Sequence, residues 1–117
     1  MISRKRETFG PGDVLIVPFP FAERDASKRR PALVLSSADF VERTGTVVVA
    51  MITTRGHAPW PHDVPLTDLS AAGLSTPCVV RWKLATRDAR LVHAKAGSLA
   101  PADRKSVRAA FQRAIAL

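Results

Sequence analysis

Short apolar runs separated by polar, proline-containing or glycine-containing segments extend through most of the chain, and this pattern predicts a small β protein. A β-branched run at residues 14–17 stops at Pro18, which marks a strand end near the edge of a sheet. The continuous Leu and Val content of residues 31–37 predicts a strand buried on both faces, and one helical turn is expected before Gly45. Residues 46–54 form the strongest β-branched run and therefore predict the central strand.

The second half of the chain alternates loops with weaker strand patterns and ends in a helical pattern. Residues 63–66 are typical of a short exposed strand, and residues 78–82 and 91–99 predict two more strands on either side of an undecided segment. Behind Pro101, which suits the first turn of a helix, apolar residues recur at helical spacing. Five or six short strands and one terminal helix predict a mainly β fold, a strongly bent antiparallel sheet or barrel.

Length and composition restrict the class of protein. The 117 residues suffice for one core, so we expect a single domain over residues 1–117, with residues 1–10 polar and loose. The single cysteine, Cys78, allows no intrachain disulfide, which favours a reduced, cytoplasmic setting. The first residues lack the apolar stretch of a signal peptide and no run reaches transmembrane length, so neither export nor membrane insertion is expected.

The charge balance favours anionic partners. Lys and Arg number 18 against 10 Asp and Glu, which gives a formal net charge of +8. A field of this sign attracts polyanions. Nucleic acid, an anionic membrane surface and an acidic protein therefore all remain open as partners.

Three consecutive cations, Lys28, Arg29 and Arg30, stand directly before Pro31 and the buried strand. Because helical backbone is disfavoured in the residue before a proline, we expect Arg30 to be held extended at the start of the strand. Charge runs most often face water. The triplet alone therefore leaves a solvated surface cluster and a phosphate-binding site as alternatives.

The central strand ends in hydroxyl residues. Thr53 and Thr54 are followed by Arg55 and Gly56. Hydroxyl groups and backbone N–H groups at a strand end can hold a phosphate. Threonine is also a common strand residue, so a purely structural role remains the alternative.

Aromatic and histidine residues add weaker candidates. Trp60, between prolines in a loop, is a candidate to stack on a base, whereas Trp82 follows an apolar run and is expected in the core or an interface. His57 and His62 lie in a loop without cysteines or a carboxylate pattern nearby, so no metal site is expected. An acid–base pair of histidines, with His93 as the third candidate, remains chemically possible. A glycine-rich phosphate loop, a G-x-S-x-G motif and paired catalytic carboxylates are not found in the sequence.

Four segments in this order together resemble the MazF/PemK toxins of bacterial type II toxin–antitoxin systems. They are GDVLIVPFPF (12–21), KRRPALVLS (28–36), VVVAMITT (47–54) and RWKLATRDARLVHAKAGSLAPAD (81–103). The resemblance implies a compact SH3-like, CcdB-type barrel with a C-terminal helix, a homodimer and a cognate antitoxin. It also implies an endoribonuclease that needs no metal or other cofactor and cuts single-stranded mRNA at short sequences, leaving 2′,3′-cyclic phosphate and 5′-hydroxyl ends.

The resemblance also assigns residues. By position, Arg30 matches the family's catalytic arginine and Thr53 its catalytic threonine, whereas the group that takes the 2′-hydroxyl proton is not identified. The connection 21–29 matches a loop that contacts substrate and is remodelled by antitoxin, but it lacks the usual glycine-rich stretch. Trp82 or Lys83 stands where other members read bases, so the cut sequence stays open. We expect RNA contacts from Lys28, Arg29, Thr54, Arg55, Trp60 and Lys83.

Two other classes of protein remain as alternatives. A CcdB-like toxin that binds DNA gyrase has the same type of barrel but no enzymatic activity, and it needs neither Arg30 nor Thr53. A basic small-barrel module that only binds nucleic acid would explain the charge alone. The arginine before proline and the threonine at the strand end favour the nuclease.

Overall fold

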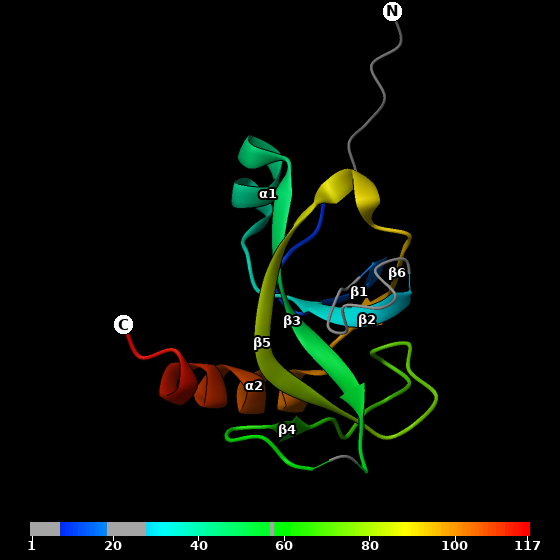
Figure 1. The fold of residues 1–117 in the computed structure, drawn as a ribbon, viewed down its shortest axis with the longest axis vertical. Coiled ribbons are helices and arrows are strands. Elements are labelled where there is room, and N and C mark those ends of the chain that lie inside the picture. The colour runs from blue at the N-terminus through cyan, green and yellow to red at the C-terminus, as the bar shows by residue number, and fades with distance from the viewer. Residues whose placement is uncertain (1–7, 19–27, 57) are drawn as a thin grey trace, which may run out of the picture.

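The computed structural model describes residues 8–18, 28–56 and 58–117, which form a mainly β domain with a terminal helix (Figure 1). Its strands are β1 (Asp13–Pro18), β2 (Arg29–Val34), β3 (Thr46–Thr54), β4 (Val64–Pro65), β5 (Cys78–Asp88) and β6 (Ala94–Ser98). Its helices are α1 (Ala38–Thr44), the 3₁₀ helix η1 (Ala89–Leu91) and α2 (Pro101–Ala114). None of the helices in this described part of the chain is long and apolar enough to span a membrane.

The six strands form one antiparallel sheet in the order β4-β5-β3-β2-β1-β6. The sheet curls into a half-barrel, with α2 across one side and α1 at one end (Figure 1). Because β3 lies between β5 and β2, the prediction of a central strand at 46–54 is confirmed. The expected bent antiparallel fold is confirmed as well.

The segment that follows β4 lies against the opposite edge of the sheet. The backbone N–H of Ser98 in β6 donates to the carbonyl oxygen of Ala71 at 3.0 Å. A Cβ on Gly97 would overlap that same carbonyl oxygen, so only glycine allows this close backbone approach. The segment after β4 thus contacts β6, the strand at the other edge of the sheet.

We expect Gly97→Ala to lower the free energy of unfolding by about 2 kcal/mol, because the added methyl group meets backbone rather than a movable side chain. Urea denaturation would measure the change. Gly10→Ala is the matched control, since a Cβ at Gly10 would meet nothing within 4 Å. Equal stabilities of the two variants would contradict the close approach at Gly97.

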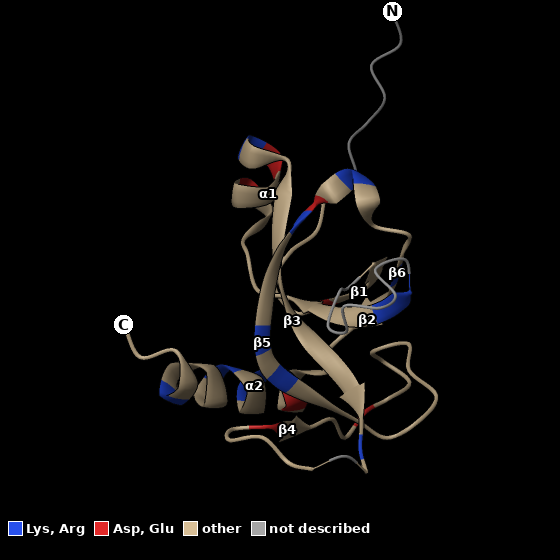
Figure 2. Ribbon diagram, in the orientation of Figure 1, with Lys and Arg blue, Asp and Glu red and all other residues tan. Residues whose placement is uncertain are grey.

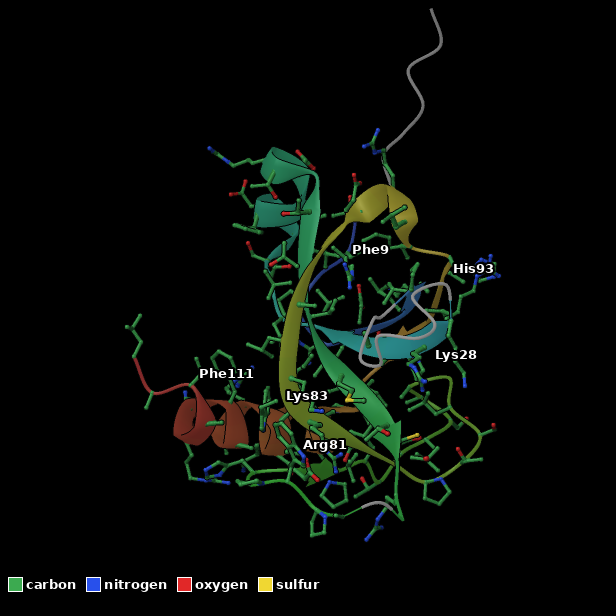
Figure 3. The ribbon with its side chains drawn as sticks, in the orientation of Figure 1. Phe9, Lys28, Arg81, Lys83, His93 and Phe111 are labelled. Carbon is green, nitrogen blue, oxygen red and sulfur yellow. The ribbon has the colours of Figure 1, made fainter. Side chains whose placement is uncertain are left out.

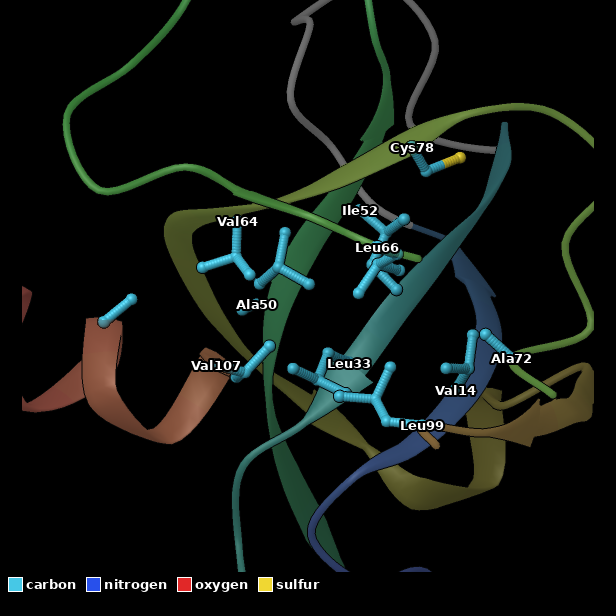
Figure 4. Close-up of a cluster of buried hydrophobic side chains, with 12 residues drawn as sticks. Val14, Leu33, Ala50, Ile52, Val64, Leu66, Ala72, Cys78, Leu99 and Val107 are labelled. Atoms are coloured by element: carbon cyan, nitrogen blue, oxygen red, sulfur yellow. The ribbon is translucent and has the colours of Figure 1, made fainter. Parts of the chain in front are cut away.

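Alternation along the strands places apolar residues on both faces of the curled sheet. The first cluster lies under α2 and is shown in Figure 4. It contains Val14, Leu33, Ala50, Ile52, Val64, Leu66, Ala72, Cys78, Val80, Leu99, Val107 and Ala110. The second cluster lies on the opposite face and contains Phe9, Leu15, Val17, Ala32, Val34, Val41, Val47, Val49 and Met51. The prediction that 31–37 is buried on both faces is therefore confirmed for its strand residues.

A buried carboxylate connects α2 to the loop after β4. Asp103, in the first turn of α2, is 1% exposed. Its carboxylate accepts hydrogen bonds from the N–H and hydroxyl of Thr67 at 3.0 and 2.7 Å, and from the N–H of Asp68 at 2.9 Å. Burial by itself raises the pKa of Asp103, but these hydrogen bonds outweigh it and hold the pKa below its ordinary value.

Several predicted boundaries differ from the structure. β5 continues through residues 83–88, which the sequence left undecided, and its pairing with β3 is irregular between Ala50 and Met51. Phe9 is 2% exposed and belongs to the second cluster, so the prediction of a loose segment over residues 1–10 is wrong at this position. Residues 1–7 lie outside the described residues.

Candidate functional site

Arg30 lies where the sequence places it, at the start of β2. The register of β1 and β2 pairs Arg30 with Val17 and Arg29 with Pro18. Pro31 follows inside the strand, and its restriction on the preceding residue fits the extended backbone of Arg30. Arg30 is half-buried, whereas Lys28 and Arg29 are exposed.

Thr53 lies near the end of the neighbouring strand β3. The pairs between β2 and β3 end at Ala32 and Met51, and continuing this register by two residues brings Arg30 opposite Thr53. Side chains two residues apart on a strand share a face. The structure therefore places Arg30 and Thr53 on the same face as the second cluster, at its open end.

The residues beside these two side chains on the same face are apolar. Val17 and Ala32 are fully buried, and Met51 is 9% exposed. We call these three residues the apolar floor of the site, because each is next to Arg30 or Thr53 in its strand or register. Arg30 and Thr53 therefore border a buried apolar surface.

Arg29 faces a histidine rather than Thr53. Its Nη1 lies 3.2 Å from Nε2 of His93, and the backbone N–H of His93 donates to the carbonyl oxygen of Ile16 at 2.8 Å. Because arginine has only donors, Nε2 of His93 is the acceptor in this contact. Lys28 and His93 lie on the same side of the molecule, close to the start of β2 (Figure 3).

Two of the expected RNA contacts lie apart from this face. Thr54 is paired with Cys78 and alternates to the face opposite Thr53. Arg55 lies beyond the end of β3 and is exposed, with its backbone N–H bonded to the carbonyl oxygen of Pro77 at 2.9 Å. The structure does not bring either side chain together with Arg30.

Two further expected RNA contacts, Trp60 and Lys83, lie against each other. Nζ of Lys83 lies 4.4 Å from the ring centroid of Trp60, which is 43% exposed. Trp82 instead packs edge-on against Phe111 of α2, with ring centroids 5.6 Å apart, as expected for a core residue. His62 is exposed, and His57 lies outside the described residues.

The sequence prediction missed a buried ion pair on β5. Arg81 donates from Nε and Nη2 to the carboxylate of Asp63 at 3.1 and 2.8 Å. Burial raises the pKa of Asp63, but the hydrogen bonds from Arg81 and from the N–H of Trp60 hold it below its ordinary value. An arginine inside an apolar strand must find a partner, so its position between Val80 and Trp82 was the available signal.

Cations gather around this face. Figure 2 shows Lys and Arg at the start of β2 and along β5. They include Lys28, Arg29, Arg30, Arg81 and Lys83. Cations from both β2 and β5 thus contribute to this part of the sheet, although Arg81 is already paired with Asp63.

Comparisons with known proteins identify the family of this chain. Residues 10–115 match the model of the PemK-like, MazF-like toxin family of type II toxin–antitoxin systems. No curated protein sequence matches the chain.

Three solved structures are similar over nearly their whole length. MazF from Deinococcus radiodurans is 26% identical, with a TM-score of 0.71, over 96% of this chain and 100% of that chain. Mycobacterium tuberculosis toxin MazF-mt6 is 24% identical, with a TM-score of 0.71, over 90% and 97%. An endoribonuclease in complex with its cognate antitoxin from Mycobacterial species is 20% identical, with a TM-score of 0.73, over 92% and 95%. From the family match over almost the entire sequence, the chain belongs to the PemK-like, MazF-like toxins of type II toxin–antitoxin systems.

Proposed function

We propose that this toxin is an endoribonuclease that cleaves single-stranded mRNA at short sequences without a metal, and that Arg30 and Thr53 carry the chemistry. The observation that supports the assignment most directly is the position of these two residues. They stand on the same face of adjacent strands, next to buried apolar residues, in a chain of the MazF-like family. The mycobacterial structure of the same fold described above is that of an endoribonuclease.

The proposed reaction is an internal transesterification. The ribose 2′-oxygen bonds to the adjacent phosphorus and loses its proton, while the P–O5′ bond breaks and the 5′-oxygen gains a proton. The products are a 2′,3′-cyclic phosphate and a 5′-hydroxyl. Negative charge on the phosphoryl oxygens is greatest in the transition state, which therefore needs positioned cations and donors.

Arg30 and Thr53 supply such groups. The planar guanidinium of Arg30 fits two phosphate oxygens at once, and its positive charge suits it to stabilise the transition state rather than to act as a base. The hydroxyl of Thr53 donates a hydrogen bond to a phosphate oxygen. The exposed cations Lys28 and Arg29 attract the RNA backbone to this face. Most of the loop before them, residues 19–27, lies outside the described residues.

The same charge suits a protein inhibitor. Deinococcus MazE-MazF is a complex of this fold with a TM-score of 0.72 and 21% identity. We expect this toxin to have its own cognate antitoxin in the cytoplasm, with an acidic, initially disordered segment that folds over the basic face. The net charge of +8 favours such a partner.

A homodimer is part of the proposal, and an apolar strip supports it. Phe40, Leu84 and Ile115 are each about 40% exposed and line one groove together with Leu35 and Phe111. Contiguous exposed apolar surface of this kind is typical of protein interfaces. A second copy of the chain would remove it from water.

Sedimentation velocity tests the dimer. We expect Leu84→Glu to shift the chain from dimer to monomer, because it introduces a charge into the apolar strip. Leu91→Glu is the control, since Leu91 is an exposed apolar residue outside the groove. If the unmodified chain is monomeric at micromolar concentration, the proposed homodimer is wrong.

Incubation with a defined RNA in excess EDTA tests the nuclease. We expect cleavage that EDTA does not reduce, with 2′,3′-cyclic phosphate and 5′-hydroxyl ends. Ends with 3′-hydroxyl and 5′-phosphate would refute the mechanism. Absence of cleavage of diverse RNAs, with growth arrest on expression, would favour a gyrase-binding toxin, and salt-sensitive binding without scission would favour a simple binding module.

A further inference from the structure

The loop after β3 ends in a turn with an unusual backbone. The N–H of Asp63 donates to the carbonyl oxygen of Trp60 at 3.1 Å, so residues 60–63 form a β-turn. Pro61 occupies its second position and His62 its third, with φ 64°. This is the pattern of a type II turn, whose third position normally holds glycine. Contacts from outside the turn are therefore needed to hold His62 in this conformation.

The anchoring contacts come from β5. The Asp63 carboxylate accepts from Nε and Nη2 of Arg81 at 3.1 and 2.8 Å and from the N–H of Trp60 at 2.9 Å. Nη2 of Arg81 also donates to the carbonyl oxygen of Ala58 at 3.1 Å. The indole N–H of Trp82 donates to the carbonyl oxygen of His62 at 2.7 Å. The side chains of Arg81 and Asp63 are only 9% and 13% exposed, so this anchor is protected from water.

The anchored turn presents an indole ring. Trp60 is 43% exposed, while its backbone N–H is held by the Asp63 carboxylate at 2.9 Å. The guanidinium carbon of Arg81 lies 5.7 Å and Nζ of Lys83 4.4 Å from the ring centroid. Both cations come from β5, and the exposed fraction of Trp60 shows that part of its side chain remains open to solvent. A partly exposed indole ring is suited to stack on a base. The cations beside it can attract the phosphates of the same RNA.

The turn stands beside the proposed catalytic pair. Arg81 pairs with Met51, and Thr53 follows two residues later on β3. Arg81 and Thr53 are therefore diagonal neighbours on one face, and residues in this relation lie roughly 7–8 Å apart. A phosphate held between Arg30 and Thr53 would have an adjoining nucleotide within reach of Trp60.

We infer that Trp60 stacks on the base next to the scissile phosphate and determines the base preference at that one position, with Asp63 and Arg81 as its positioning residues. This inference rests on the proposed function. A purely structural anchor would alter stability, but it would not alter which base precedes or follows the cut.

Cleavage of a random-sequence RNA pool tests the inference, with the 5′-hydroxyl ends sequenced. We expect Trp60→Ala to flatten the base preference at one position next to the cut and to raise KM about tenfold, the scale of losing one stacked base. Trp60→Phe keeps an aromatic face and should retain the preference. Asp63→Asn weakens the ion pair with Arg81 and should therefore broaden the base preference at the same position. Leu91→Ala, also exposed and apolar, is the control and should change nothing.

A second readout does not depend on cleavage. In the Arg30→Ala background, binding of a short single-stranded RNA should quench the indole fluorescence, and the quenching should disappear with Trp60→Ala. Unchanged base preferences and unchanged quenching in Trp60→Ala would overturn the inference while RNA cleavage stands. Quenching through Trp60 without cleavage by the unmodified chain would overturn the proposed function and leave the stacking site intact.

Discussion

We expect Arg30→Ala to remove most of the RNA cleavage, whereas Arg29→Ala should leave the rate at saturating RNA close to that of the unmodified chain. Arg30 stands half-buried opposite Thr53 by register, and its loss removes charge stabilisation in the transition state. Removing such a group costs about a hundredfold to a thousandfold in rate. Arg29 is exposed and bonded to His93, so its loss weakens RNA capture and reduces the slope of log binding against log salt by about one.

Single-turnover cleavage of one RNA at several salt concentrations separates these effects. Thermal melting of both variants provides the control for folding, and we expect both to melt near the unmodified chain because neither arginine is part of a buried cluster. Thr53→Val, which removes the hydroxyl and keeps the shape, should resemble Arg30→Ala. Equal losses of cleavage rate for Arg29→Ala and Arg30→Ala would refute the division of roles between the two arginines.

We expect Asp103→Ala to destabilise the fold by about 3 kcal/mol, because it leaves buried donors of Thr67 and Asp68 without their charged acceptor. For a chain of this size the thermal midpoint falls by roughly 10 °C. Asp39→Ala is the matched control, since Asp39 also lies in the first turn of a helix but is exposed in a surface ion pair with Arg43. That pair contributes well under about 1 kcal/mol.

The destabilisation has a defined pH dependence. The folded pKa of Asp103 lies below the ordinary value, so its contribution is complete above about pH 4 and is lost as the pH falls through the folded pKa. The melting temperatures of the unmodified chain and Asp103→Ala should therefore converge in acid. A difference that stays constant down to pH 2, or equal melting of the Asp103 and Asp39 variants at pH 7, would argue against a stabilising role for the buried Asp103 carboxylate.

The sequence predicted the elements better than their long-range pairing. Local β-branched content located β1 to β3, and Pro101 located the start of α2. The extension of β5 past Trp82 was missed, because a bulge opposite Ala50 and Met51 breaks the two-residue period that identifies a strand. The burial of Phe9 was missed because a single aromatic residue in a polar segment gives no local pattern that indicates its packing in the second cluster.

The candidate site shows the same division. The position of Arg30 followed from Pro31, a neighbour in sequence, and Thr53 from the end of a strand. The partnership of Asp63 with Arg81 spans 18 residues and depends on the pairing of β4 with β5, which no local pattern encodes. The face on which Thr54 lies likewise required the register of β3.

The floor formed by Val17, Ala32 and Met51 has a consequence for how salt acts on this protein. Dissolved ions screen charges in water strongly, but they screen poorly those that lie against a surface of low dielectric constant. RNA approaching the exposed cations Lys28 and Arg29 meets the full ionic atmosphere, whereas a phosphate seated over the floor is partly insulated from it. If Arg30 and Thr53 carry the cleavage as proposed, RNA is captured and cut in two different electrical environments on one face. We therefore expect ionic strength to change how often RNA binds more than how fast bound RNA is cut.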